Sequence, residues 1–365
     1  MANVFIFRSI GGIPVQKRAC FYKLVIFRLL PYLKIQGLLV SADVENYFDA
    51  LLEPVDGLEN VLKEVSASPP LKQPRLLFVR FREHEAQTNE FVELLSDHLV
   101  DYAIPLTKRQ QANAQGAKSN TGGSMAAASR LRREAIRLLV KYSKENSSRY
   151  GEIGELISYV VAVHFLRAGQ VGAKMALKTS SEMPIHGADG LHARANADGT
   201  VTFFLLESKI TPSAADASRE MVDSASEFQA DRGRRLNELR LVSDLSNLEA
   251  LQGEQREAAK SFFNVYSGNG NHLKRRDIHV GSLVFSEEAY NEKLKRDAEQ
   301  PITIHEDHFE SQYAANHPRF QKNLTNQAAA KGLDLGGCIV FLVAVPDVYE
   351  LKRIFAELNN EHICD

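Results

Sequence analysis

One segment of the sequence, residues 201–206, is apolar on both faces of the strand it would form. It reads Val-Thr-Phe-Phe-Leu-Leu and follows an Asn-Ala-Asp-Gly stretch at 196–199, which is typical of a tight turn. A strand without a polar face belongs in the middle of a sheet that is covered on both sides. Helical periodicity flanks it at 125–144, 152–166 and 214–228. The sequence therefore predicts an α/β fold.

Further elements are predicted on either side of this segment. Apolar runs that favour strands lie at Leu76–Val79, Val171–Leu177, Asp189–Arg194, Ile278–Phe285 and Cys338–Val345. Amphipathic helices are predicted at Glu85–Leu99 and Asp347–Leu358. Strands and helices thus alternate along most of the chain.

Length and composition limit the classes of protein to consider. The 365 residues correspond to about two domains of ordinary size, and the net charge of −2 excludes a histone-like polycation. The three cysteines are far apart and form no Cys-x-x-Cys pair, which favours a cytoplasmic protein. We expect no membrane segment, because no stretch combines the length and the uninterrupted apolar character of a spanning helix.

Composition also suggests how the chain is divided. Residues 1–36 are basic and contain no acid, so they form a basic arm, an extra strand, or a segment translated from too early a start. A small N-terminal α/β unit follows at 37–107. Residues 108–124 contain no large apolar side chain and predict a linker or mobile loop. The main domain then occupies 125–365.

Charged residues follow the buried strand directly. Side chains two residues apart on a strand point the same way, so Glu207 and Lys209 share one face and Ser208 occupies the other. Charges at the end of a buried strand need a partner or a bound cation. A short hairpin would place Asp189 beside Glu207, and Mg²⁺ is the usual ion between two such carboxylates. Lys209 is then left to orient or deprotonate a water molecule.

A further carboxylate lies on the helix predicted at 152–166. Glu152 is explained by the favourable interaction of a first-turn acid with the helix dipole. Glu155 is less easily explained, because the remaining positions are almost all apolar and predict a helix buried on every side. We therefore assign Glu155 to the site as its helix-borne member.

The order of these motifs resembles that of a known group of enzymes. An acid on a leading helix, Asp189 on the second strand and Glu-x-Lys at the end of the third resemble the PD-(D/E)xK nuclease superfamily. More narrowly, Gly-Glu-Ile-Gly-Glu at 151–155, His-Gly-Ala-Asp-Gly at 186–190 and Leu-Leu-Glu-Ser-Lys at 205–209 look like the HamA family, nuclease subunits of bacterial Hachiman antiphage systems. One departure is Ala188, where proline often precedes the aspartate.

The resemblance covers residues 151–211 at motif level and, less specifically, the chain after Gly37. It implies a restriction-endonuclease-like mixed sheet with flanking helices, and makes 125–365 the nuclease domain. It also implies metal-dependent cleavage of DNA and a helicase partner, HamB.

The resemblance also implies a role for each site residue. Asp189 and Glu207 would ligate Mg²⁺ or Mn²⁺, Glu155 would be a further ligand or hold a water, and Lys209 would activate the nucleophile. Two alternatives stay open. The chain could be a catalytically silent DNA-binding or gating subunit, or an unrelated metal hydrolase acting on small phosphoesters.

The helix predicted at 125–144 carries a stripe of cations. Their spacings of three or four residues align them on one face. The five residues are Arg130, Arg133, Arg137, Lys141 and Lys144. The stripe fits a phosphate backbone, but it equally fits an ordinary solvated surface opposite an apolar face.

Other signals are weaker. Lys274–Arg276 is a lesser basic candidate, His305–His308 has a metal-like spacing without partners, and His186 is close enough to the motif to contact a phosphate. Glu350 and Lys352 repeat the Glu-x-Lys spacing. Apolar residues around them follow helical periodicity, however, so these two side chains diverge by about 200°.

Overall fold

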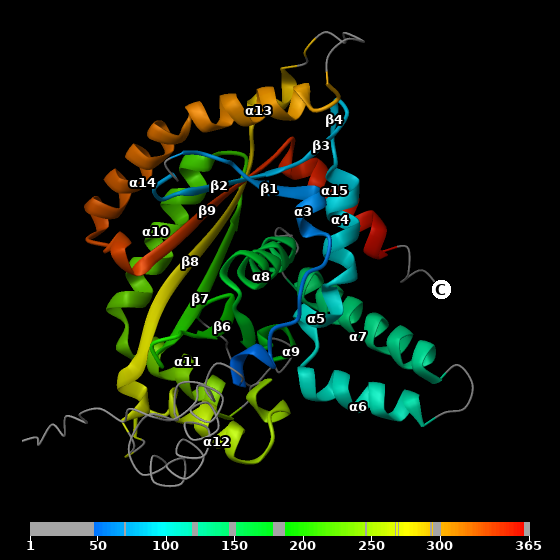
Figure 1. The fold of residues 1–365 in the computed structure, drawn as a ribbon, viewed down its shortest axis with the longest axis vertical. Coiled ribbons are helices and arrows are strands. Elements are labelled where there is room, and N and C mark those ends of the chain that lie inside the picture. Colours follow the sequence, from blue (N-terminus) through cyan, green and yellow to red (C-terminus); the bar gives the residue numbers. More distant parts are fainter. Residues whose placement is uncertain are drawn as a thin grey trace, which may run out of the picture.

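The computed structural model describes most of the chain. The described residues are 47–68, 71–118, 123–145, 151–177, 187–244, 247–266, 268, 270–292, 294 and 301–360. The basic arm predicted at 1–36 lies outside them, as does His186. Figure 1 shows a long twisted sheet with helices on both sides.

Within the described part of the chain, seven strands form one sheet in the order β1-β2-β9-β8-β7-β6-β5. Their bounds are β1 (Leu62–Glu64), β2 (Arg75–Val79), β5 (Gly169–Gly172), β6 (Gly190–Ala195), β7 (Val201–Ile210), β8 (Arg275–Ser286) and β9 (Cys338–Val345). The β2–β9, β9–β8 and β8–β7 pairs are parallel, and the other three are antiparallel. A separate ribbon pairs β3 (Phe81–Arg82) with β4 (Glu85–Ala86). The predicted α/β class with a mixed sheet is confirmed.

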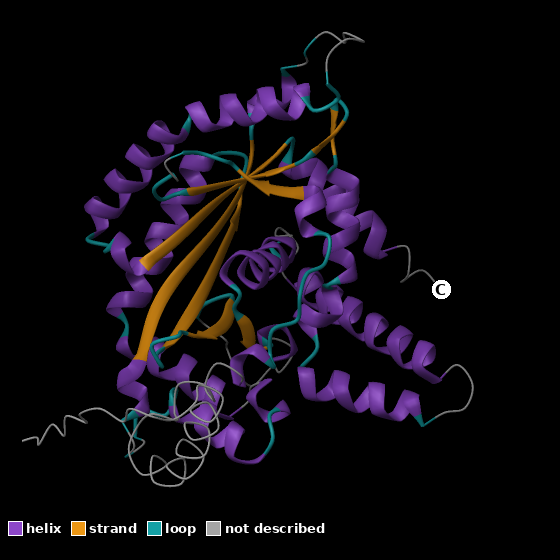
Figure 2. Ribbon diagram, in the orientation of Figure 1, coloured by secondary structure: helices purple, strands orange, loops and turns teal. Residues whose placement is uncertain are grey.

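Helices surround the sheet (Figure 2). In chain order they are α3 (Leu58–Val61), α4 (Thr88–Asp97), α5 (Leu99–Ala103), α6 (Leu106–Ala117), α7 (Gly123–Glu145), α8 (Glu152–Leu166), α9 (Lys174–Leu177), α10 (Ala214–Ala230), α11 (Arg232–Asp244), α12 (Gly253–Ser261), α13 (Ile304–Ala315), α14 (His317–Lys331) and α15 (Val348–Asn360). Short 3₁₀ turns are η2 (Asn247–Ala250), η3 (Asn271–Lys274), η4 (Glu288–Asn291) and η5 (Leu335–Gly337).

Helices α8 and α10 cover opposite faces of the sheet. Consecutive residues of β8 show this, because neighbouring side chains on a strand point to opposite faces. A Cβ at Gly281 would lie 2.9 Å from Met221 of α10, whereas the Ser282 hydroxyl is 3.1 Å from that of Ser158 on α8. The central strands are therefore enclosed between these two helices.

Strand β7 has the double cover that its composition predicts. Its first six residues, Val201–Leu206, are all buried, and burial lessens from Glu207 onward. It pairs antiparallel with β6 and parallel with β8. The polar end of β7 is therefore less buried than its apolar beginning.

Most predicted elements are present with small shifts at their ends. The helices predicted at 125–144 and 152–166 are α7 and α8, and the strand predicted at 189–194 is β6. The strand predicted at Val171–Leu177 is wrong from residue 173 onward, because β5 ends at Gly172 and α9 begins at Lys174. Among the described strands, β5 lies at the edge of the sheet and pairs only with β6.

The prediction of a linker or mobile loop at 108–124 is wrong for residues 108–117 and for 123–124, where α7 begins, while 119–122 lie outside the described residues. Helix α6 occupies 108–117 and packs along α7 (Figure 1). The segment lacks large apolar side chains, but its Ala, Gln, Lys and Arg are good helix formers. Arg109 of α6 is 6% exposed and joins this helix to α5 and to the preceding segment, because it pairs with Asp101 at 2.9 Å and with Glu53.

The segment predicted as an N-terminal unit, 37–107, shares the central sheet. Its strand β2 pairs in parallel with β9, close to the other end of the chain. The described part of this segment thus contributes two strands, β1 and β2, to the same sheet that carries β6 and β7. The division of the chain into two domains stays a prediction.

Candidate active site

The site begins at the β6–β7 hairpin, which places Asp189 opposite the polar end of β7. Gly190 pairs with Leu206, and the Asp189 N–H donates to the Leu206 carbonyl at 2.7 Å. The Asp189 carboxylate then accepts two hydrogen bonds from Ser208, from its N–H at 2.8 Å and from its hydroxyl at 2.9 Å. The hairpin expected from the sequence is confirmed.

Glu207 and Lys209 share the other face of β7, as their spacing predicts. Lys209 Nζ donates to Glu207 Oε1 at 2.6 Å, with both side chains about one fifth exposed, at 22% and 19%. Glu207 also lines a cavity of about 100 Å³ together with Ser224 and Phe228 of α10. The carboxylate is therefore largely buried but borders on an accessible space.

The positive charge around Glu207 does not fully compensate its carboxylate. Burial and the neighbouring charge of Asp189 raise the pKa of Glu207 from 4.5 to about 7, although Lys209 acts in the opposite direction. Burial also disfavours the Lys209 ammonium, but the charges of Glu207 and Asp189 outweigh this effect and raise the pKa of Lys209. An added cation would stabilise this acid pair.

Ser208 occupies the opposite face and faces helix α8. A Cβ at Gly154 would lie 3.4 Å from the Ser208 hydroxyl oxygen, within ordinary contact distance. Gly154 therefore lets α8 approach the end of β7 closely. Two residues of the Gly-Glu-Ile-Gly-Glu motif, Glu152 and Glu155, are carried to this end of the sheet by α8 and are 2% and 8% exposed.

Glu155 contacts a residue that the sequence analysis missed. Its Oε2 accepts a hydrogen bond of 2.5 Å from the Tyr102 hydroxyl, on α5. Burial and the charge of Glu155 raise the pKa of Tyr102 well above its ordinary value. Asp189 and Glu152 contribute in the same direction, so their charges also act at this hydroxyl. No local pattern marks Tyr102, because its importance comes only from packing against α8.

Lys209 is bonded to Glu207, and the charge of Asp189 acts on both of these residues. Among the described residues, no group of three or more His, Cys, Asp or Glu side chains is placed so that it could hold a metal ion. Two carboxylates with a neighbouring lysine fit a hard cation such as Mg²⁺, whose remaining ligands are commonly water and phosphate oxygens. Glu155 is in the same electrostatic environment but is bonded to Tyr102.

The basic stripe predicted on residues 125–144 lies on α7. The side chains of Arg130, Arg133 and Arg137 are exposed, while Leu131 and Ala135 on the other side of the helix are buried. Lys141 and Lys144 belong to the same helix, but their side chains lie outside the described residues. The predicted amphipathic helix is confirmed, and its role in DNA binding stays a prediction.

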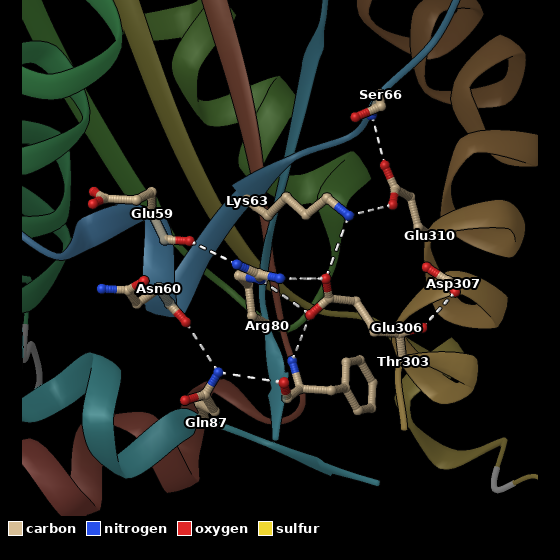
Figure 3. A network of polar contacts seen from close by, with 11 residues as sticks. Glu59, Asn60, Lys63, Ser66, Arg80, Gln87, Thr303, Glu306, Asp307 and Glu310 are labelled. Carbon is tan, nitrogen blue, oxygen red and sulfur yellow. Dashed lines mark hydrogen bonds and ion pairs between the residues drawn. The ribbon is translucent and has the colours of Figure 1, made fainter. Parts of the chain in front are cut away.

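The weaker motifs have structural partners. Glu306, from the segment with metal-like spacing, accepts hydrogen bonds from Arg80 at 2.9 Å and from the Phe81 N–H at 3.1 Å, and pairs with Lys63 at 3.3 Å (Figure 3). Its carboxylate thus joins α13 to the β1–β2 edge of the sheet. Arg275 pairs with Asp277, and Arg276 with Asp198. These contacts account for Glu306, Arg275 and Arg276 without a bound ligand.

The architecture defines the class of this protein: an α/β protein with a mixed sheet and flanking helices, consistent with a restriction-endonuclease-like core. A family model, HamA, matches residues 58–357, and the chain belongs to this family, the HamA of Hachiman systems. Membership points to a role in antiphage defence. Comparison with curated proteins found no match, and comparison with solved structures found none. No helix in the described ranges has both the length and the apolar character needed to span a membrane.

Proposed function

We propose that this chain is a metal-dependent DNA nuclease, the effector subunit of a two-component antiphage complex with a helicase. The observation that carries the proposal is the arrangement of Asp189 and Glu207 at the end of β7. Burial and repulsion from Asp189 both disfavour the ionised form of Glu207, so the pKa of Glu207 rises to about 7. A site that tolerates such a pair suits a divalent cation.

Asp189 and Glu207 would hold Mg²⁺ or Mn²⁺, which supplies charge stabilisation for the phosphoryl oxygens and lowers the pKa of a bound water. Asp189 is oriented for this role by its two hydrogen bonds from Ser208. Lys209 stands beside Glu207, where it can orient the attacking water and stabilise developing negative charge.

Glu155 fits the role of a water-holding residue better than that of a direct ligand. One of its oxygens is occupied by the Tyr102 hydroxyl, and it does not complete a metal-binding group among the described side chains. Tyr102 holds the carboxylate in one orientation. Held in this way, the Glu155 carboxylate would orient a water molecule near the acid pair.

DNA would be held in part by the exposed face of α7. Arg130, Arg133 and Arg137 offer cations at helical spacing, as a phosphate backbone requires. We extend this surface to Lys141 and Lys144 on the same helix. The net charge of −2 means that affinity must come from such local clusters.

A partner is expected because the chain lacks a motor of its own. The sequence contains no Gly-x-x-x-x-Gly-Lys-[Ser/Thr] phosphate loop, and its nearest approach, at 116–123, lacks the required lysine. A HamB-like helicase, as the family implies, would deliver DNA to the site or restrain it, in the cytoplasm of the cell.

The proposal is tested by mixing the purified chain with the helicase encoded beside it and following degradation of linear duplex DNA. We expect cleavage with Mg²⁺ or Mn²⁺, no cleavage with a chelator, and loss of cleavage in Asp189→Asn. Full activity in chelator would refute the metal mechanism. DNA binding without cleavage in either metal, by the wild-type complex, would instead support a gating subunit.

A further inference from the structure

A buried ion pair lies against the segment that leads into Asp189. It joins Lys174 of α9 to Glu238 of α11, with Lys174 Nζ 2.7 Å from Glu238 Oε1. Their side chains are 2% and 1% exposed. Neither residue belongs to the motifs that the family resemblance highlights, and the two are 64 positions apart in the sequence.

Both partners bind the backbone of Ala188. Lys174 Nζ donates to the Ala188 carbonyl oxygen. Glu238 Oε1 accepts from the Ala188 N–H at 3.1 Å. The ion pair therefore satisfies both main-chain polar groups of the residue that precedes Asp189.

These contacts fix the peptide group on which Asp189 depends. The Ala188 carbonyl and the Asp189 N–H belong to one planar peptide unit. Lys174 holds the carbonyl, and the Leu206 carbonyl of β7 accepts from the N–H at 2.7 Å. The peptide plane is thus held at both ends, and Ser208 then orients the carboxylate.

Gly187 provides the space for this arrangement. A Cβ at this position would lie 1.6 Å from Glu238 Oε1, and 3.2 Å from Lys174 Nζ. No side chain can replace glycine there unless the Glu238 carboxylate moves. The glycine before Ala188 in the His-Gly-Ala-Asp-Gly motif therefore has a physical reason, which is the close approach of the ion pair.

The pair is not well explained as a source of stability. Burial raises the pKa of Glu238, and repulsion from Asp189 adds to this although Lys174 opposes it. Glu238 Oε2 is buried and has no hydrogen-bond partner among the described residues. Buried pairs of this kind can often be replaced by apolar residues without loss of stability. A role in geometry explains why two charges are buried here.

We propose that Lys174 and Glu238 are positioning residues that hold the Ala188–Asp189 peptide so that the Asp189 carboxylate lies beside Glu207. An effect of these two residues on catalysis rests on the proposed function, in which Asp189 is a metal ligand. Neither residue is placed to contact substrate, so their effect passes through Asp189.

The test replaces both charges at once, in Lys174→Met with Glu238→Met, in the full-length chain. We expect backbone amides of Ala188 and Asp189 to exchange with deuterium about fivefold faster or more, because hydrogen bonds are removed. In the helicase complex, cleavage should slow by about 10²-fold and the Mg²⁺ concentration for half-maximal rate should rise, since small displacements of a reacting group have effects of this size. The temperature of unfolding should fall by a few degrees, because the buried N–H and carbonyl of Ala188 lose their hydrogen-bond partners.

A matched control is the double variant Arg80→Met with Glu306→Met, which removes a buried carboxylate and its arginine near the β1–β2 edge (Figure 3). It should leave exchange at residues 188–189 and the cleavage rate unchanged. If it accelerates this exchange and slows cleavage as strongly, the effect reflects general destabilisation and the inference is wrong.

Unchanged exchange at Ala188 and Asp189 in the folded Lys174→Met, Glu238→Met variant would overturn the inference. If that variant does not fold, Gly187→Ala takes its place, because it displaces Glu238 without removing either charge; it should accelerate the same two amides, and wild-type exchange would again overturn the inference. The exchange readout does not depend on activity. Should the wild-type complex cleave no DNA, the proposed function falls, while exchange still decides whether the pair positions Asp189.

Discussion

The Glu-x-Lys spacing occurs both at the end of strand β7 and in helix α15, and the two copies differ in side-chain direction, in exposure and in the pKa of the glutamate. On β7 the side chains of Glu207 and Lys209 point the same way, and Lys209 Nζ lies 2.6 Å from Glu207 Oε1. On α15 a separation of two residues corresponds to a rotation of about 200°. Glu350 accordingly bonds to Arg353 at 2.6 Å, one turn along the helix. The backbone period, rather than the residue types, decides whether the two charges meet.

The surroundings of the two glutamates differ as well. Glu207 is 19% exposed and its pKa is raised, whereas Glu350 is 48% exposed and hydrogen bonds from Arg353 lower its pKa. Lys352 is half-buried, and burial lowers its pKa although the charge of Glu152 opposes this. The charge of Glu350 is already compensated by Arg353, so a bound cation would add little there. Glu207 is buried near a second acid, and a bound cation would stabilise its ionised form.

The largest expected difference between the two copies is in catalysis. Glu207→Gln should reduce DNA cleavage by the helicase complex about 10³-fold or below detection, because an amide cannot replace the charge of a metal ligand. Glu350→Gln, with the same chemical change, should leave the rate unchanged. Equal rates for the two variants would remove the basis for placing the site on β7.

The lysines sharpen the comparison. Lys209→Met should lower the cleavage rate about 10²-fold, as expected for loss of a group that activates water or stabilises charge. The Mg²⁺ concentration for half-maximal rate should not rise, because Lys209 is not a ligand. Lys352→Met on α15 serves as the control with an unchanged rate. A rise in the Mg²⁺ requirement of Lys209→Met would mean that this lysine supports binding rather than chemistry.

The two glutamates should affect stability in opposite directions with pH. Glu207 binds a proton more tightly in the folded protein than in the unfolded chain, so its contribution to stability is complete below pH 4.5 and is lost as the pH rises from 4.5 to about 7. The loss is on the order of 3 kcal/mol, and Glu207→Gln should abolish it. Glu350 stabilises the protein above pH 4.5, and this effect is lost as the pH falls.

The pH dependence is measured by urea unfolding of the chain in the presence of a chelator, for the wild type, Glu207→Gln and Glu350→Gln. The difference in unfolding free energy between wild type and Glu207→Gln is the relevant quantity. A difference that is constant across this pH range would show that Glu207 titrates as it does in the unfolded chain.

The smallest expected effect is on DNA binding, where the exposed face of α7 is compared with that of α15. Neutral replacements at Arg133, Arg137 and Lys141 should weaken DNA binding and reduce the slope of log affinity against log salt by about one for each phosphate that is no longer bound. Arg353→Gln on α15 should not change the slope, because its charge is already paired with Glu350 and Glu357. Binding measured by fluorescence anisotropy at several salt concentrations distinguishes these outcomes. A slope unchanged in the α7 variant would mark its stripe as a solvated surface.

Much of the site's frame follows from local sequence. The unbroken apolar run at 201–206 predicts a central strand, and the turn residues at 196–199 predict the hairpin that carries Asp189 to Glu207. The apolar composition of 152–166 predicts the enclosed helix α8. These elements are local because hydrogen-bond period and side-chain direction depend on residues only a few positions apart.

Sequence reasoning failed where tertiary contacts overrode composition. Residues 108–117 look like a linker, but Arg109 pairs with Asp101 and Glu53 and anchors them as helix α6. The run at Val171–Leu177 looks like one strand, but the chain turns at its middle so that Lys174 reaches Ala188. Long charged side chains can satisfy buried partners that no periodicity reveals.

By itself the sequence determined which residues share a face: Glu207 with Lys209, Ser208 opposite them, and Glu350 apart from Lys352. These relations depend only on the strand or helix period. Only the tertiary structure decided that Tyr102 bonds to Glu155 across 53 positions, and that Lys174 and Glu238 hold the peptide before Asp189. Such contacts arise when separate elements pack against one another, and the position of one element relative to another is not encoded in the pattern of either.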